Sequence, residues 1–129
     1  MKKEIKTKFE NINKIAEKIF SNKNVKAVYL FGSYATGNPK PLSDIDLCVI
    51  GNLKEKDKIK ISGYSSDNLD ISFFDELPIY IKFRVFRDGK PLLIKDEKYL
   101  WLIKKITLNQ YRDFKPIINK RIKEVFEYV

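Results

Sequence analysis

Three aspartates of this chain stand where their carboxylates could act together. Asp44 and Asp46 lie at the start of the apolar stretch Ile45–Ile50, and residues i and i+2 of a strand point to the same face. Asp70 lies in another apolar stretch, residues 69–74, where an acidic side chain is disfavoured. If the two stretches are neighbouring strands, the three carboxylates converge, and oxygen ligands of this kind suit Mg²⁺. Taken singly, each motif is equally compatible with solvated acids at a strand end or a sheet edge.

A Gly-Ser pair, Gly32 and Ser33, directly follows a third apolar stretch, Val25–Phe31. A glycine lets the backbone approach a ligand closely, and a serine can offer its hydroxyl and its N–H to a phosphate group. The same pair is also ordinary turn sequence. It therefore supports a phosphate site only in combination with the carboxylates, where two Mg²⁺ ions could hold both the attacking and the leaving oxygen of a phosphoryl transfer.

Composition excludes several classes of site. The 129 residues include no histidine and a single cysteine, Cys48. Histidine-dependent hydrolysis, histidine-ligated zinc and an internal disulfide are therefore impossible, which leaves carboxylates, hydroxyls, lysine, tyrosine and bound metal for catalysis. No apolar stretch approaches the ~20 residues of a membrane span, and no apolar signal-peptide core follows the basic N-terminus. We therefore expect a cytoplasmic protein that does not associate with membranes.

The net charge of +9 is unevenly distributed along the chain. Residues 27–78 carry −3, whereas residues 1–26 carry +5 and residues 79–129 carry +7. A basic chain suits a polyanionic partner, but 22 of its 26 basic residues are lysine. Arginine binds phosphates and bases better, because its guanidinium can donate two parallel hydrogen bonds. We favour a solvated basic surface over a nucleic-acid groove, with an acidic centre suited to metal and an anionic substrate.

Apolar periodicity predicts the elements that must position these residues. The expected strands are residues 25–31, 45–50, 69–74 and 92–94; the expected helices are residues 5–20, residues 53–61 and a final helix with Asp96 as its N-cap. One face of this final helix is expected to carry a stripe of Leu100, Ile103, Thr107, Tyr111, Phe114, Ile118 and Val125. Residues 36–43 are expected to form a loop and residues 88–91 a turn. Residues 79–87 fit either a strand or a helix, and we favour the helix. Pro116 should kink or split the final helix.

The combined motif resembles that of a known family. Leu30-Phe31-Gly32-Ser33, ten further residues and Asp44-Ile45-Asp46-Leu47 resemble the signature of the DNA polymerase β-like nucleotidyltransferase superfamily. The short chain is similar to its minimal nucleotidyltransferase family, and the resemblance extends more loosely to Asp70 and to residues 86–90. It implies an α+β fold in which flanking helices cover a small mixed β-sheet.

The resemblance also implies how the chain is organised. We expect one domain over residues 1–129, with a motif core at residues 25–78 and a C-terminal helix extension at residues 96–129. One position departs from the family pattern, because Thr36 stands where members often carry arginine. A fixed cation is therefore absent there, and Lys40 is the candidate replacement.

A set of roles in nucleotidyl transfer follows from the same resemblance. Gly32 and Ser33 would contact the nucleoside triphosphate. Asp44 and Asp46 would hold divalent metal. Asp70 would share a metal ion and activate the attacking hydroxyl. The implied reaction transfers a nucleoside monophosphate, AMP from ATP, to a hydroxyl group and releases pyrophosphate, with two Mg²⁺ ions as cofactors.

Many minimal members resemble antitoxins. They are encoded beside a HEPN-domain ribonuclease toxin and inactivate it by adding AMP to a tyrosine. The resemblance therefore implies a HEPN-type toxin as the partner of this chain and as the acceptor of AMP.

Two other functions remain open. A catalytically silent antitoxin would neutralise its partner by contact alone, through the basic flanks and the aromatic residues of the final helix (Tyr99, Trp101, Tyr111, Phe114, Phe126 and Tyr128). An enzyme that adds nucleotides to an RNA end would use the basic flanks to hold nucleic acid. We rank the RNA enzyme last, because the chain shows no second domain that could hold RNA.

Overall fold

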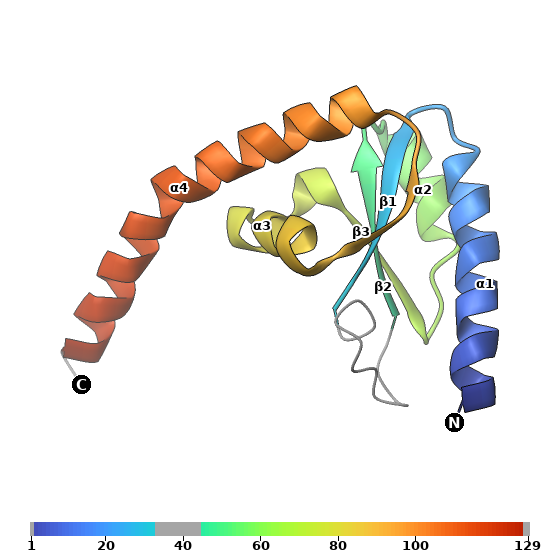
Figure 1. Cartoon of the computed structure of the whole chain (residues 1–129), viewed down its shortest axis with the longest axis horizontal. Helices are drawn as coiled ribbons and strands as arrows, with labels where there is room; N and C mark the ends of the chain where they lie inside the picture. Colours follow the sequence, from blue (N-terminus) through green and yellow to red (C-terminus); the bar gives the residue numbers. More distant parts are fainter. Residues whose placement is uncertain (1, 33–44, 128–129) are drawn as a thin grey trace.

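A computed structural model describes residues 2–32 and 45–127 (Figure 1). Its elements follow in the order α1 (Lys2–Phe20), β1 (Val25–Phe31), β2 (Ile45–Gly51), α2 (Glu55–Ser62), β3 (Leu69–Phe73), a 3₁₀ turn (Phe74–Glu76), α3 (Ile79–Asp88), β4 (Lys90–Ile94) and α4 (Glu97–Glu127). This order confirms the expected α+β class. The expected loop at residues 36–43 lies outside the described residues, and no helix of the described part is long and apolar enough to cross a membrane.

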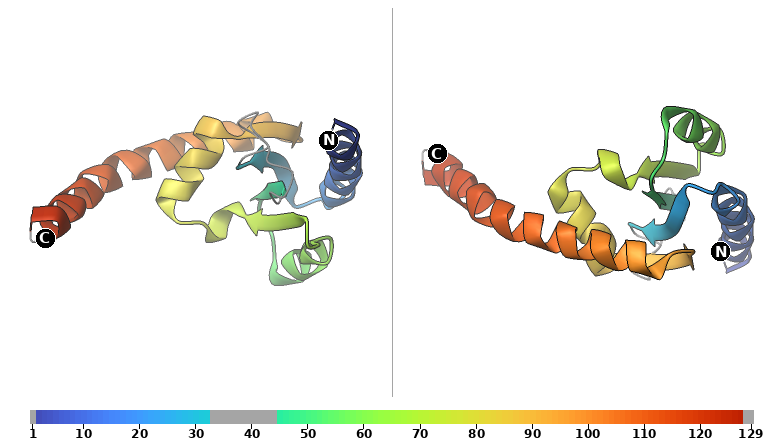
Figure 2. Two further views of the ribbon diagram at one scale, coloured as in Figure 1. Left: turned by 90° about the horizontal axis from the view of Figure 1, so that it is seen from below. Right: turned by 90° about the horizontal axis from the view of Figure 1, so that it is seen from above.

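The described strands form one mixed sheet in the order β3-β2-β1-β4. β1 pairs antiparallel with both β2 and β4, while β2 and β3 run parallel and are joined through α2. A parallel pair needs such a crossover, because a tight hairpin can join only antiparallel strands. The helices α1 and α2 cover one face of the sheet, and α3 and α4 cover the other (Figures 1 and 2).

Both faces of the central strands are buried, which explains why β1 and β2 are almost continuously apolar. One face packs against an apolar stripe of α1 and against α2; its buried residues are Ile12, Ala16, Ile19, Val25, Val28, Leu30, Ile45, Leu47, Val49, Ile61, Leu69 and Phe73. The other face packs against α3 and α4, and its buried residues are Ala27, Tyr29, Cys48, Ile50, Phe74, Val85 and Leu100. The second core has fewer buried residues than the first.

A buried carboxylate joins α2 to the turn between α1 and β1. Asp57 accepts hydrogen bonds from Asn22 Nδ2 (3.1 Å), Asn24 Nδ2 (2.9 Å) and the backbone N–H of Lys54 (3.0 Å). These donors, the side chain of Asn22 foremost, lower the pKa of Asp57 to about 2. The hydrogen-bonding needs of this carboxylate are therefore met within the protein, without a ligand.

The final helix begins where it was predicted to begin, and Pro116 does not end it. Asp96 Oδ1 accepts a hydrogen bond from the backbone N–H of Tyr99 (3.0 Å), which confirms Asp96 as the N-cap of α4. The helix runs through Pro116 without interruption, so it is not split. Figure 1 shows a bend near its middle, and the missing N–H of proline permits such a bend. None of the stripe residues whose side chains are described is exposed: Leu100, Ile103, Thr107, Tyr111, Phe114 and Ile118. The side chain of Val125, the last residue of the predicted stripe, is not among those described.

Other boundaries differ from the expected ones. β3 ends one residue early, because Phe74 belongs to the 3₁₀ turn that precedes Pro78. β4 begins at Lys90, so the expected turn at residues 88–91 is shorter, and Pro91 lies in an edge strand, where proline is tolerated. α2 begins at Glu55 and not at residue 53. Residues 79–87 lie within α3, which confirms the favoured alternative for this segment.

Candidate functional site

The sheet brings two of the predicted site residues together. β2 and β3 pair in parallel with Asp46 opposite Asp70, so both side chains leave the same face of strands that lie ~4.8 Å apart. Further along β2, Cys48 and Ile50 share this face and pack towards α3 and α4. Asp46 is half-buried and Asp70 is exposed, while Asp44 lies outside the described residues. Asp46 and Asp70 therefore form an acid pair beside the α3–α4 core.

Gly32 brings the backbone against this acid pair. It directly follows Phe31, the last residue of β1, which pairs with Asp46 across the sheet. The φ of Gly32 is +80°, a conformation that side-chain-bearing residues rarely adopt. A Cβ atom at this position would also lie 2.5 Å from Asp46 Oδ2. The backbone angle and the nearby carboxylate thus both require a glycine here; Ser33, the next residue, lies outside the described residues.

A cavity of about 310 Å³ opens beside Gly32, and we call it the Gly32 cavity. Its walls are Phe31 and Gly32 from the end of β1 and Ile81, Arg84 and Asp88 from α3. The three residues of α3 are spaced i, i+3 and i+7, which places them on one face of the helix. α3 therefore contributes a guanidinium and a carboxylate to a hollow that adjoins the acid pair.

The charged groups of α3 differ in how they are paired. Asp88 accepts two hydrogen bonds from Arg87, from Nε to Oδ1 at 3.0 Å and from Nη2 to Oδ2 at 2.8 Å. This fork holds the pKa of Asp88 below its ordinary value and the pKa of Arg87 above its own. The side chain of Arg84 is exposed and forms no ion pair or hydrogen bond with the residues that the structure describes, although its charge also contributes to lowering the pKa of Asp88. Of the two arginines of α3, Arg84 is therefore the one open to a ligand.

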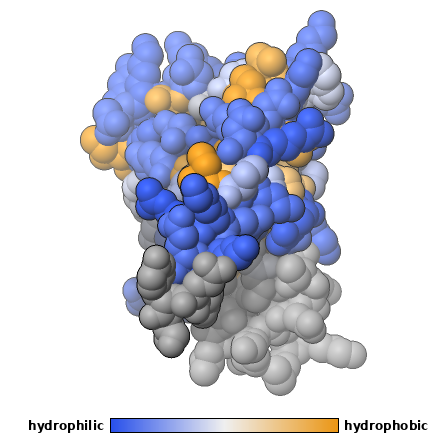
Figure 3. Space-filling view, turned by 90° about the vertical axis from the view of Figure 1, so that its left-hand side faces the viewer, coloured by the Kyte–Doolittle hydropathy of each residue, from blue (hydrophilic) through white to orange (hydrophobic). Residues whose placement is uncertain are grey.

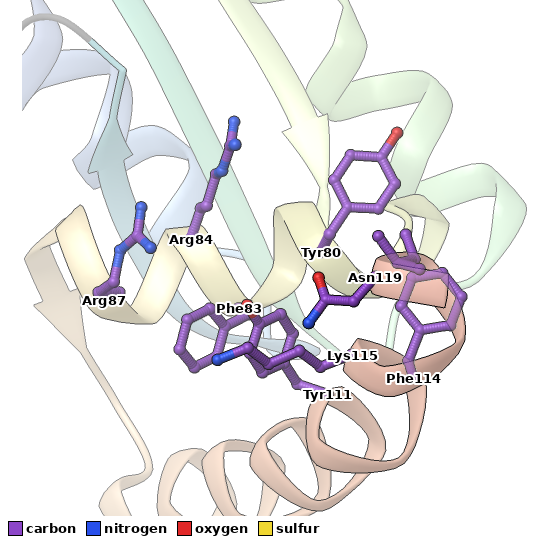
Figure 4. A pocket seen from close by; sticks show the side chains of 9 residues that line it. Tyr80, Phe83, Arg84, Arg87, Tyr111, Phe114, Lys115 and Asn119 are labelled. Carbon is purple, nitrogen blue, oxygen red and sulfur yellow. The ribbon is translucent and has the colours of Figure 1, made fainter. Parts of the chain in front are cut away.

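A second hollow, of about 280 Å³, lies between α3 and α4, and we call it the α3–α4 groove (Figure 4). Phe83 of α3 stacks on Tyr111 of α4, with ring centroids 3.8 Å apart and ring planes 4° apart. The guanidinium of Arg87 lies 5.7 Å from the centroid of the Phe83 ring. The lining residues include three cations and no acid: Tyr80, Phe83, Arg84, Arg87, Tyr111, Phe114, Lys115, Ile118 and Asn119. Arg84 thus lines both this groove and the Gly32 cavity.

The chemistry of the acid pair suits a divalent cation. Asp46 and Asp70 offer carboxylate oxygens, which Mg²⁺ prefers, and a cation beside them would offset their mutual repulsion. No group of three or more acidic, histidine or cysteine residues that could hold a metal occurs among residues 2–32 and 45–127, and Asp44, the third predicted ligand, lies outside them. Cys48 is no ligand, because burial, with the charge of Asp75, raises the pKa of its thiol to about 12.

Sequence patterns indicated Gly32, Asp46 and Asp70 as site residues but did not indicate the contribution of α3. Arg84 and Asp88 reach this site because α3 packs on the same face of the sheet that carries Asp46. A signal was present, since Ile81, Arg84 and Asp88 have helical spacing within a segment for which a helix was favoured. Helical spacing does not identify the surface that a helix face meets, so the site could not be completed from it.

Comparisons with known proteins agree with this architecture. The family described as Polymerase beta, Nucleotidyltransferase matches residues 13–98. A protein of Methanocaldococcus jannaschii named "Putative protein adenylyltransferase MJ1547" is 33% identical over 104 residues, which cover 78% of this chain and 77% of that protein. The family match spans every strand and includes Gly32, Asp46, Asp70 and Arg84.

Solved structures with the same fold come from toxin–antitoxin complexes. A chain of a toxin–antitoxin crystal structure with AMP-PNP is 20% identical, with a TM-score of 0.71 over 88% of this chain and 98% of that chain. A chain of the complex between tri-AMPylated Shewanella oneidensis HEPN toxin and MNT antitoxin is also 20% identical, with a TM-score of 0.63 over 87% and 96% of the two chains. At such identities the likeness is one of fold.

Proposed function

The chain belongs to the polymerase β nucleotidyltransferase family and is a nucleotidyltransferase, and we propose that it transfers AMP from ATP to a hydroxyl group of a partner protein. The observation that carries the proposal is the meeting of Gly32, Asp46 and Asp70 at one end of the sheet. A protein as acceptor is supported by the relative that is named an adenylyltransferase of proteins.

In the proposed reaction, the acceptor oxygen attacks the α-phosphorus of ATP. The bond from this phosphorus to the oxygen that bridges to the β-phosphate breaks, and pyrophosphate leaves. Gly32 and Ser33 would hold the triphosphate through backbone N–H groups and the serine hydroxyl. Asp70, which is exposed, would accept the proton of the acceptor hydroxyl.

Asp44, Asp46 and Asp70 would hold the metal ions, two Mg²⁺ in our proposal. Their carboxylate oxygens are of the type that this ion prefers, and Asp46 and Asp70 lie opposite one another in the sheet. Bound Mg²⁺ would supply neutralisation of the negative charge that develops on the phosphate oxygens. The carboxylates would in turn stop repelling the triphosphate once they are neutralised.

We also propose that the acceptor is a tyrosine of a HEPN-type toxin and that the chain acts as its antitoxin. Support comes from the two complexes with the same fold, one of which contains an AMPylated HEPN toxin bound to an MNT antitoxin. A tyrosine hydroxyl on a partner surface could reach the acid pair from the exposed side of Asp70.

The test is transfer of label, with Mg²⁺ present, from ATP labelled at its α-phosphate to the HEPN-type product of a neighbouring gene. We expect the wild-type chain to label this protein and EDTA to stop the labelling. Asp46→Asn and Asp70→Asn should each lower the rate by about 10²–10³-fold. Asp67→Asn changes an exposed acid close to β3 and should leave the rate intact. Labelling that persists in the Asp46→Asn/Asp70→Asn double variant would contradict the proposal.

A second candidate function, neutralisation by contact alone, is supported by one surface feature. Trp101 and Leu102 of α4 are 63% and 49% exposed and line one surface hollow together, and adjoining apolar side chains in solvent are a feature of binding surfaces. On the face seen in Figure 3, hydrophobic residues form small patches that hydrophilic residues separate. If contact suffices, Asp46→Asn will neutralise the toxin as well as the wild type does, whereas Trp101→Glu will not. If transfer is needed, Asp46→Asn will lose neutralisation.

A further inference from the structure

We propose that Arg84 binds the triphosphate of the nucleotide, so that α3 forms one wall of the nucleotide site. The ligand class is a polyphosphate anion held in the Gly32 cavity. This inference rests on the proposed function, because the nucleotide is the substrate of the transfer proposed at the acid pair.

The position of Arg84 is the first argument. Arg84 and Gly32 line the same cavity, and the neighbouring walls are the apolar side chains Phe31 and Ile81. Figure 4 shows Arg84 extending from one side of α3, while Phe83 leaves the other side and meets Tyr111. The guanidinium is therefore directed away from the aromatic stack, and a phosphate close to Gly32 would lie in the cavity that it lines.

The charge balance of the cavity is the second argument. Asp88 also lines the cavity and would repel a phosphate, but the two hydrogen bonds from Arg87 neutralise it. Arg84 has no such partner within the described part of the chain, so its five N–H donors can bind a ligand. The described residues that line the cavity thus include one paired acid and one cation without an ion pair, a balance that favours an anion.

The chemistry of the side chain is the third argument. A guanidinium is planar and always charged, and it can donate two parallel hydrogen bonds to the oxygens of one phosphate. The α3–α4 groove, which Arg84 also lines, is less suited to a nucleotide. Phe83 already stacks on Tyr111, and the guanidinium of Arg87 lies near the same ring, so this pair does not present an open platform for a base. We therefore assign the phosphate to the Gly32 cavity.

The experiment compares nucleotide affinities by titration calorimetry with Mg²⁺ and without an acceptor protein. Arg84→Ala should weaken ATP binding by about 10–100-fold, the effect of losing charge-assisted hydrogen bonds, but change AMP binding by less than about 2-fold. Arg84→Lys should recover part of the ATP affinity, because lysine keeps the positive charge but cannot donate two parallel hydrogen bonds. Arg121→Ala removes an exposed arginine of α4 and is the matched control. Circular dichroism and thermal unfolding of each variant check that it folds.

Three results would overturn the inference: equal ATP affinity in Arg84→Ala and Arg121→Ala, equal loss for ATP and AMP, or no ATP binding by the wild type. The labelling experiment distinguishes its failure from that of the proposed function. If Arg84→Ala binds ATP normally while the wild type still labels its acceptor, only the role of Arg84 is wrong. If ATP binding depends on Arg84 but no acceptor is labelled, the triphosphate contact stands and the transfer proposal fails.

Discussion

Two carboxylates of this chain, Asp57 and Asp70, lie on opposite faces of the sheet and differ in exposure and in their hydrogen bonds. Asp57 lies on the α1–α2 side, is 9% exposed and accepts three hydrogen bonds from the protein. Asp70 lies on the other side, opposite a second carboxylate, Asp46. Its side chain is exposed and forms no ion pair or hydrogen bond with the described residues. The first carboxylate stabilises the fold, and the second is open to a ligand.

The hydrophobic cores on the two faces of the sheet also differ. The α1–α2 core is the larger one, and it joins residues of α1 and α2 to the face of the sheet that both helices cover. The α3–α4 core is smaller and borders the Gly32 cavity and the α3–α4 groove. We conclude that one face supplies most of the stability and the other supplies the chemistry, and four substitutions test this division.

Ile19→Ala should have the largest effect on stability. Ile19 of α1 is fully buried in the α1–α2 core, so its truncation should lower the free energy of unfolding by about 2–5 kcal/mol. Urea unfolding followed by circular dichroism measures this loss. Ile59→Ala, at a residue that is 73% exposed, should change it by less than about 0.5 kcal/mol. The division between faces fails if folded Ile19→Ala protein transfers AMP much more slowly than the wild type.

Gly32→Ala should lower the transfer rate strongly and the stability only a little. The new methyl group would meet the Asp46 carboxylate, and the backbone would be held at a φ of +80°, so we expect transfer to fall by about 100-fold. The strain should cost only about 1–3 kcal/mol of stability. Gly63 has an ordinary helical φ of −63°, and Gly63→Ala is the control that should keep full transfer. Initial rates of labelling give the comparison, and a fully active Gly32→Ala variant would refute the role of this turn.

Asp57→Asn should change how stability depends on pH. The folded pKa of Asp57 is lowered to about 2 from an ordinary value of 3.8, so its contribution is complete above that ordinary value and is lost as pH falls towards 2. Between pH 5 and pH 2, roughly the window that these pKa values define, the wild type should lose more unfolding free energy than Asp57→Asn does. Urea unfolding at each pH measures this difference. If the free energy of unfolding changes with pH equally in the two proteins, the pKa of Asp57 is not lowered by its hydrogen bonds. Asp113→Asn, which changes an exposed acid, is the control.

Asp96→Ala should have the smallest effect of the four. It removes the acceptor for the N–H of Tyr99 at the start of α4, which should cost about 1 kcal/mol. Asp96→Ser should restore most of the loss, because serine is also a good N-cap. Thermal unfolding of the three proteins checks this order. Equal stability of Asp96→Ala and Asp96→Ser would mean that the cap contributes little.

Much of the local structure was predictable because it depends on neighbours in sequence. The continuous apolar stretches of β1 and β2, the helical stripe of α4 and the N-cap at Asp96 are local patterns, and each is confirmed over the described residues. Boundaries were less predictable, as Phe74 and Pro91 show, because the end of a strand depends on what its edge pairs with. The predicted roles of Gly32, Ser33, Asp44, Asp46 and Asp70 in nucleotide and metal binding all stay predictions.

The residue types alone excluded histidine-dependent catalysis and an internal disulfide, since the chain has no histidine and a single cysteine, and they left carboxylates, hydroxyls, lysine, tyrosine and bound metal for catalysis. They also indicated that Gly32 and the aspartates belong together. Only the tertiary structure decided that Asp46 lies opposite Asp70, because strand register depends on packing across the sheet. It likewise decided that Arg84 lines a cavity with Gly32, although the two residues are far apart in sequence. A local pattern can show which face of α3 carries Arg84, but only packing determines what that face meets.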